Sequence, residues 1–328
     1  MMRKYACLLL FALILNGCDD GDVTVETLDF SDIKQASSCP SSNNQLVYKI
    51  KSQESLLLQL DKDTFKNEPT LPGKPNTYQI DDNKFKLYYR SYDGPVGIPN
   101  ICDFIPPTTP NVINEWYAKS GRIEIATTAI TSTNSTTNAI TITGYSHNIV
   151  IKNITYSVSS LDITQPQVVF GDFTTTVADV DKLDLAFTRP LVQCPTSKQI
   201  YTYNTKSAMT IDAIDPLLIK NEATAPNSPR RGLIGSTVNK LLYKLFTGPP
   251  VSDDYFCGTT IPTTPTVKET WTGVDGVANT SGIIEVTTTT AVNNQFKHTI
   301  VLKNTSIKKG NNFVNLGTSY VLGELLTK

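Results

Sequence analysis

The chain contains two copies of one sequence pattern, and this duplication restricts its possible folds more than any other feature. The same short motifs return about 155 residues later, in the same order. The offset changes only where connecting segments differ in length, as expected for a domain duplicated in tandem. Matching segments include Cys39-Pro40 and Cys194-Pro195, Lys66–Glu68 and Lys220–Glu222, Pro107–Pro110 and Pro262–Pro265, Trp116 and Trp271, and His147–Asn153 and His298–Asn304.

Each copy has about 145 residues, enough for a hydrophobic core of its own. We place the first domain at 28–180 and the second at 181–328. Apolar residues alternate with polar ones in short segments rich in Ile, Val, Tyr and Thr, which predicts β-strands. No segment has a sustained helical stripe, although 61–67 and 215–221 each fit a single helical turn. The predicted fold is all-β, with two tandem antiparallel β-sandwich-like or open-barrel domains.

The N-terminus has the pattern of a secretory signal peptide. Arg3 and Lys4 precede an apolar run at 8–15, which is much shorter than the ~20 residues of a membrane-spanning helix. Leu15-Asn16-Gly17-Cys18 follows and resembles the lipobox of bacterial lipoproteins. The resemblance implies that residues 1–17 are removed, that Cys18 receives lipid, and that 18–27 form the lipid anchor and tether. The alternative is an ordinary cleaved signal peptide with an accidental cysteine.

Acidic residues follow the lipobox directly. Asp19, Asp20 and Asp22 resemble the export signal of Bacteroidota surface lipoproteins, which implies an outer-membrane, lipid-anchored protein exposed on the cell surface. In enteric bacteria Asp19 would instead resemble an inner-membrane retention signal, and a plain solvated linker is a third interpretation. The formal net charge is -1 and no basic stripe is present, so nucleic acid is not an expected partner.

The chain has six cysteines, of which Cys7 falls in the signal and Cys18 is the predicted lipid acceptor. The other four allow three pairings, and an exported location permits disulfides. These four are Cys39, Cys102, Cys194 and Cys257. Duplication selects the pairings within each copy, Cys39–Cys102 and Cys194–Cys257, because each domain must have closed its own bond before it was copied. A four-cysteine metal site would need Cys-x2-Cys spacing, which is absent.

The chain's two histidines, His147 and His298, occupy equivalent positions. Each is expected at the start of a strand, bonded to backbone or facing water, rather than serving as a metal ligand or an acid–base group. Trp116 and Trp271 are also equivalent. They fill the core or, if exposed, stack on a sugar ring or enter a partner's pocket.

Other recurring or clustered side chains have structural interpretations. Glu124 and Glu285 are expected to face solvent on strands rather than to form a catalytic carboxylate pair. Tyr88, Tyr89 and Tyr92 lie on one predicted strand, whose alternation sends them to both faces.

The sequence shows no recurring polar cluster, which favours binding or scaffolding over catalysis. We therefore expect a non-catalytic, lipid-anchored outer-membrane and cell-surface lipoprotein, acting as a structural or accessory binding subunit of an outer-membrane complex. Its expected partners are the membrane, through lipid on Cys18, and other outer-membrane proteins. No cofactor or metal is expected. The alternative is a surface glycan-binding module that uses Trp116 and Trp271.

Overall fold

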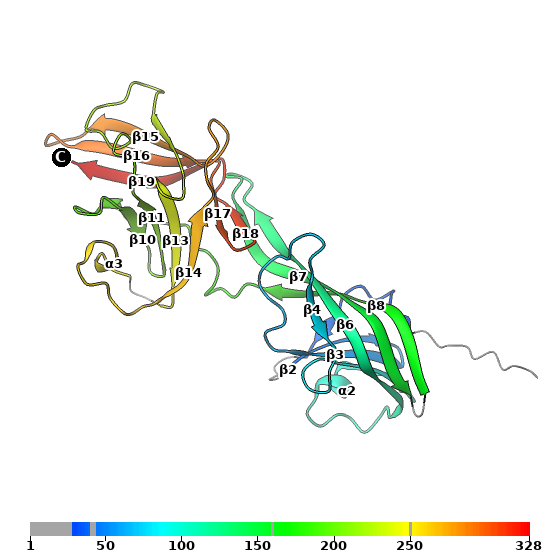
Figure 1. The fold of residues 1–328 in the computed structure, drawn as a ribbon. Helices are drawn as coiled ribbons and strands as arrows, with labels where there is room; N and C mark the ends of the chain where they lie inside the picture. The colour runs from blue at the N-terminus through cyan, green and yellow to red at the C-terminus, as the bar shows by residue number, and fades with distance from the viewer. Residues whose placement is uncertain (1–27, 40–43, 159–160, 249–250) are drawn as a thin grey trace, which may run out of the picture. The chain divides into compact units, whose positions relative to one another are not determined.

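The computed structural model describes residues 28–39, 44–158, 161–248 and 251–328. The protein is 52% strand and 3% helix (Figure 1). Its sheets are antiparallel, and the described residues form no closed barrel. The predicted all-β, sandwich-like fold is therefore confirmed.

Short strands precede three long ones in the first copy. They are β1 (Ser37–Ser38), β2 (Asn44–Lys51), β3 (Glu54–Asp61), β4 (Asn76–Gln79), β5 (Lys86–Tyr92), β6 (Val112–Thr133), β7 (Ile140–Val158) and β8 (Leu161–Thr176), with the one-turn helix α2 (Ile98–Cys102) before β6.

Shorter strands make up the second copy. They are β9 (Val192–Gln193), β10 (Ile200–Tyr203), β11 (Ser207–Asp212), β12 (Arg230–Leu233), β13 (Lys240–Phe246), β14 (Val267–Gly273), β15 (Ile283–Thr290), β16 (Phe296–Lys303), β17 (Ser306–Lys309), β18 (Asn312–Asn315) and β19 (Ser319–Thr327), with the helix α3 (Asp254–Cys257) before β14.

The chain divides into two compact units that do not coincide with the two sequence copies. Unit 1 comprises the described residues up to Leu60 together with 78–123 and 150–170. Unit 2 comprises 61–77, 124–149 and 171–328. The difference arises because the long strands β6, β7 and β8 each contribute residues to both units.

The two copies pair their strands in the same register. In each copy an apolar residue lies opposite a tyrosine, which in turn lies opposite a tryptophan: Leu56, Tyr89 and Trp116 in the first, and Met209, Tyr243 and Trp271 in the second. Each copy also has a register shift shortly after this tyrosine, at Ser91/Tyr92 and at Leu245/Phe246. The duplication therefore extends to the pairing of individual residues.

Two facing sheets enclose one core in unit 2 (Figure 1). One sheet has the strand order β18-β17-β14-β13-β11-β10-β9, and the other has the order β12-β15-β16-β19. Because side chains alternate along a strand, one face of each sheet turns inward. Ile211 and Tyr243 of the first sheet thus share a core with Ile284, Ile300 and Leu322 of the second.

The second copy divides strands that are continuous in the first. Residues equivalent to the single strand β6 form β14 and β15, which lie in different sheets of unit 2. The chain passes between these sheets at 274–282. Gly282 has a φ of +62°, and a Cβ there would lie 2.7 Å from the Cα of Gly276. A side chain at this position would therefore both strain the backbone and collide with it.

The helical turns lie elsewhere than expected. Residues 61–67 contain one hydrogen-bonded turn, Thr64 N–H to Asp61 O, and residues 215–221 contain two consecutive turns, Leu218 N–H to Asp215 O and Ile219 N–H to Pro216 O, but neither segment forms a helix. The one-turn helices α2 and α3 instead end at Cys102 and Cys257. Helices of four or five residues have no amphipathic periodicity, so their sequence pattern could not reveal them.

One core tyrosine carries a hydroxyl group that is not hydrogen-bonded. Tyr156 on β7 is fully buried, and its hydroxyl has no partner in the structure. Burial raises the pKa of this hydroxyl, so it stays neutral. The equivalent residue in the second copy is Ile307, also fully buried. The domain therefore accepts an apolar side chain at this position.

Replacement of this tyrosine by phenylalanine should stabilise the protein. An unsatisfied buried hydroxyl costs roughly 1–3 kcal/mol, so Tyr156→Phe should raise the free energy of unfolding by about 1 kcal/mol. Tyr145→Phe is the matched control, because the Tyr145 hydroxyl donates to Asn312 Oδ1 at 3.0 Å and its loss should destabilise. Calorimetric melting of both variants tests this. A lower melting temperature for Tyr156→Phe would show that its hydroxyl has a partner.

Candidate functional site

Four of the predicted site residues precede the described part of the chain. Cys18, the predicted lipid acceptor, and Asp19, Asp20 and Asp22, the predicted export signal, fall outside the described residues. Their roles stay predictions.

Both disulfides form within their own copy, as predicted. Cys39 bonds to Cys102 and Cys194 bonds to Cys257, each across 63 residues and with a Cα–Cα distance of 5.3 Å. A closed loop of this length stabilises a fold by ~4 kcal/mol in the chain-entropy model. Each bond fastens the first strands of its copy to the one-turn helix before the Pro-Thr-Thr-Pro segment.

Both tryptophans belong to the core. Trp116 is 7% exposed and Trp271 is 5% exposed. The Trp116 ring lies 5.1 Å from Tyr89 and 6.1 Å from Tyr156, measured between centroids, and the Trp271 indole N–H donates to Glu269 Oε2 at 3.1 Å. A sugar-stacking platform needs an open ring face. Neither indole offers one, so the structure favours the core interpretation.

Each tryptophan nevertheless borders a cavity, and the linings of the two cavities share equivalent positions beside the tryptophan. The cavity beside Trp116 has about 570 Å³ and lies in unit 1, and the cavity beside Trp271 has about 290 Å³ and lies in unit 2. Their linings share equivalent positions that hold different residues: Asn114 and Val158 in the first copy correspond to Glu269 and Lys309 in the second. The tryptophan therefore lines a cavity in both copies, but the residues beside it differ.

The Trp271 cavity holds a satisfied ion pair. Lys309 donates to Glu269, and its ammonium group also lies 5.8 Å from the centroid of the Trp271 ring. Burial, assisted by the Glu269 charge, raises the pKa of Tyr145 to about 12. The two charges cancel and the tyrosine stays protonated. This part of the cavity is therefore lined by a paired Glu269 and Lys309 and by the neutral hydroxyl of Tyr145.

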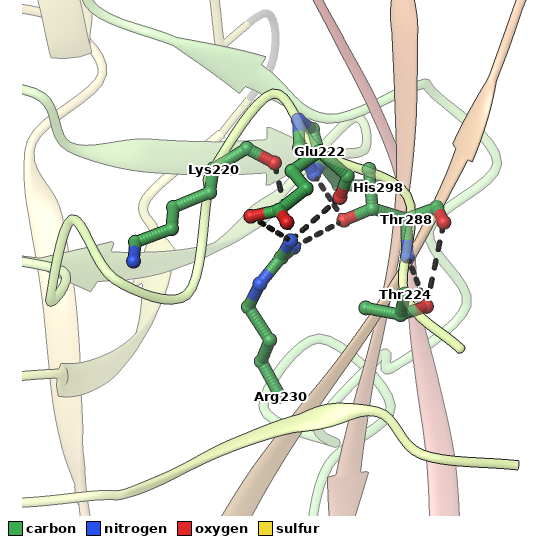
Figure 2. A network of polar contacts seen from close by, with 6 residues as sticks. All are labelled: Lys220, Glu222, Thr224, Arg230, Thr288 and His298. Atoms are coloured by element: carbon green, nitrogen blue, oxygen red, sulfur yellow. Dashed lines mark hydrogen bonds and ion pairs between the residues drawn. The ribbon is translucent and has the colours of Figure 1, made fainter.

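The clearest polar constellation surrounds the two histidines. In unit 2, Figure 2 shows the guanidinium group of Arg230 reaching Thr288, which in turn contacts His298. Arg230 Nη1 donates to Thr288 Oγ1 at 2.9 Å, and Nη2 donates to the Glu222 carbonyl oxygen at 2.6 Å. Thr288 Oγ1 lies 2.8 Å from His298 Nδ1. His298 is fully buried and lies within β16.

Both nitrogens of the His298 ring have hydroxyl partners, and the partners fix the tautomer. Nε2 lies 2.9 Å from Thr327 Oγ1, and Thr327 donates its own proton to Asn221 Oδ1. Thr327 must therefore accept from the ring, so Nε2 carries the proton and Nδ1 accepts from Thr288. The result is a one-directional chain from Arg230 to Asn221, in which every proton has an acceptor.

The first copy repeats this chain without the arginine. His147, also fully buried, lies 2.9 Å from Thr127 through Nδ1 and 3.0 Å from Thr175 through Nε2. Thr175 donates to Asn67 at 3.4 Å, as Thr327 does to Asn221. Asn76 stands at the sequence position of Arg230. We call each Thr-His-Thr-Asn set a histidine relay.

A fifth residue ties each histidine relay to a distant segment. Thr70 donates its backbone N–H to Thr127 O at 3.0 Å and accepts the Thr127 N–H through its side chain at 3.1 Å. Thr224 and Thr288 make the same two bonds at the same two distances. Each histidine relay thus holds a long connecting segment against its sheet.

The histidine relays correct two sequence-based expectations. A recurring polar cluster does exist. The histidines also lie inside strands and bond threonine side chains, rather than starting strands and bonding backbone or water. The signal was present in Lys66-Asn67-Glu68-Pro69-Thr70, repeated as Lys220-Asn221-Glu222-Ala223-Thr224. Thr127, Thr175 and Thr288 lie in threonine-rich strands where no spacing distinguishes them, and Thr327 is the last residue of β19.

The recurring glutamates and the clustered tyrosines have structural positions in the sheets. Glu285 is half-buried and pairs with Arg231 at 2.8 Å and with Lys303 at 3.9 Å, so it does not simply face solvent. Glu124, also half-buried, lies on β6. Tyr89 and Tyr92 are buried on β5, where the Tyr92 hydroxyl lies 3.1 Å from Ser55 Oγ, and Tyr88, which precedes Tyr89, is half-buried.

Two further features are absent from the described residues. No group of three or more His, Cys, Asp or Glu residues in this part of the chain could hold a metal ion. No helix in it is long and apolar enough to cross a membrane. In comparisons with known proteins, no family model, curated protein or solved structure matched the chain.

The histidine relays predict how stability depends on pH. Burial lowers the pKa of His147 to about 4, and burial together with the Arg230 charge lowers the pKa of His298. An unfolded histidine titrates near 6.5. Below that pH the unfolded chain binds protons that the folded chain does not, so acidification favours unfolding until the folded pKa is reached.

The free energy of unfolding should therefore fall between pH 7.5 and 5, by about 2 kcal/mol from His147 alone. The chain has only two histidines, so His147→Gln and His298→Gln should each flatten part of this slope. Denaturant unfolding across the pH range measures it. An unchanged slope in both variants would rule out neutral, buried imidazoles as its source.

Proposed function

We propose that this chain is a non-catalytic lipoprotein, anchored through lipid on Cys18 to the outer membrane and exposed on the cell surface. It acts there as a structural or accessory binding subunit of an outer-membrane complex. Its partners are the membrane and other outer-membrane proteins.

The observation that carries this proposal is the state of the two histidine relays. Catalytic groups need a proton to give or take and access to a substrate. His147 and His298 are fully buried, and both nitrogens of each ring are within hydrogen-bond distance of threonine hydroxyls. The polar residues that recur in both copies thus serve to hold segments together. Two disulfides support an oxidising, exported location.

The alternative, a glycan-binding module that uses Trp116 and Trp271, has less support. Both indoles are buried against aromatic or charged neighbours, so neither presents a face on which a sugar ring could stack. No second function is therefore proposed.

Anchoring is tested with two cysteine variants in the native host. Cys18→Ala should release the protein from the membrane fraction or leave it unprocessed, whereas Cys7→Ala, in the segment predicted to be removed, should change nothing. Intact mass of the wild-type chain should show loss of residues 1–17 and the addition of acyl groups. An unmodified chain that begins at Met1 would overturn the anchor.

The role as a subunit is tested by gentle detergent extraction. The protein should migrate in a complex of defined stoichiometry, detected by native mass spectrometry, and protease applied to intact cells should cut it. Recovery of the lipoprotein alone at several detergent strengths would contradict the subunit role. Complete protection while other surface proteins are cut would contradict surface exposure.

A further inference from the structure

The loop between β5 and β6 in unit 1 presents large apolar side chains to water. Phe104, two residues beyond α2, is fully exposed, and Ile105 is 81% exposed. Ile98 on α2 and Ile113 at the start of β6 are exposed as well. Single exposed apolar residues are common, but apolar side chains gathered on one loop mark a surface that meets an apolar partner. We call Phe104 and Ile105 the apolar tip.

The loop is tied down on both sides of the apolar tip. The disulfide Cys39–Cys102 precedes it directly. The Asn100 side chain accepts the Gly97 N–H at 2.9 Å and donates to Thr109 O at 3.3 Å, which bridges the loop. The apolar tip therefore projects from a fixed base.

The second copy shows that the loop folds without the apolar tip, although Ile261, one position later, is 66% exposed. Its disulfide Cys194–Cys257 and helix α3 are followed by Thr259 and Thr260 at the positions of Phe104 and Ile105. Both threonines are exposed. Phe104 and Ile105 are thus not required by the fold, and they occur only in the copy that follows the predicted lipid anchor.

The apolar tip lies within reach of that anchor. The Lys51 ammonium group donates to Asp29 O at 3.0 Å, and the next residue, Ser52, accepts the Val96 N–H at 3.0 Å. The start of the described chain and the start of the loop therefore meet at the turn between β2 and β3. Ten peptide units separate Cys18 from Leu28 and span at most about 35 Å. A membrane that holds Cys18 is consequently close enough for the loop to touch it.

We propose that Phe104 and Ile105 insert into the interfacial region of the phospholipid bilayer that holds the lipid on Cys18. The inference rests on the proposed anchor. Apolar side chains bury to a depth of roughly 5–10 Å in this region, and a tethered loop meets the bilayer at high effective concentration. Asp93 and Asp103 lie on the same exposed loop, which favours zwitterionic over anionic headgroups. The insertion fixes the orientation of unit 1 on the membrane.

The test places a reporter at the apolar tip and supplies an artificial anchor. The chain beginning at Cys18, with both disulfides formed, has Cys18 as its single free thiol, which is coupled to a maleimide lipid in phosphatidylcholine vesicles. Phe104→Trp then reports insertion through quenching by brominated acyl chains, after subtraction of the parent signal from Trp116 and Trp271. Tyr117→Trp is the control, because Tyr117 is exposed on β6 about 17 Å from Val112 along the strand.

Insertion predicts that the indole introduced by Phe104→Trp has blue-shifted emission and is quenched at least about twofold more than the indole introduced by Tyr117→Trp. Phe104→Thr/Ile105→Thr, which installs the second copy's residues, should melt like the parent but lose at least about tenfold in vesicle affinity when uncoupled. Equal quenching of the two introduced indoles would overturn the inference and leave the apolar tip to a protein partner. The vesicle test attaches Cys18 to lipid chemically, so its outcome does not depend on whether cells lipidate Cys18. Lipidation in cells is tested separately by the intact mass of the protein.

Discussion

The imidazole ring held between two threonine hydroxyls is the interaction on which each domain depends. A buried polar group destabilises a fold unless all of its donors and acceptors are matched. Here the matching partners come from two other strands and one connecting segment: Thr288, Thr327 and Asn221 around His298, and their equivalents around His147. Because these residues are distant in sequence, the histidine relay forms only when the strands have reached their final register. The histidine relay therefore couples the pairing of neighbouring strands to the tertiary structure of the domain.

Comparison of the two copies distinguishes the features that the fold requires from the features that differ between the copies. Both copies keep the disulfide, the histidine relay and the register of Tyr89 or Tyr243 against its tryptophan. They differ in the cavity lining, in the arginine beside His298 and in the residues that follow the second cysteine. The shared features are buried or covalent, and the divergent ones line cavities, face solvent or, like Arg230, are partly buried. Specific function is therefore expected from the divergent surfaces rather than from the recurring core.

Sequence alone predicts much of this architecture. The alternation of apolar and polar residues predicts the all-β class. The equal spacing of the cysteines in the two copies predicts the pairings Cys39–Cys102 and Cys194–Cys257. The histidine relays are not predictable in the same way, because Thr127 and Thr288 lie among many threonines and only tertiary contacts select them. The compact units also escape sequence analysis, since nothing in the composition of β6, β7 or β8 shows that these strands contribute to both units.

The most direct test of this account is the ionisation of the two histidines in the folded protein, followed by nitrogen-15 NMR of the ring nitrogens. The account predicts that His147 stays neutral from pH 8 to pH 5.5 and that His298 titrates below its unperturbed pKa, with the proton on Nε2 and Nδ1 acting as the acceptor in both rings. Titration of either ring near its unperturbed pKa of about 6.5, or a proton on Nδ1 of His298, would contradict the buried, fully hydrogen-bonded state of the histidine relays.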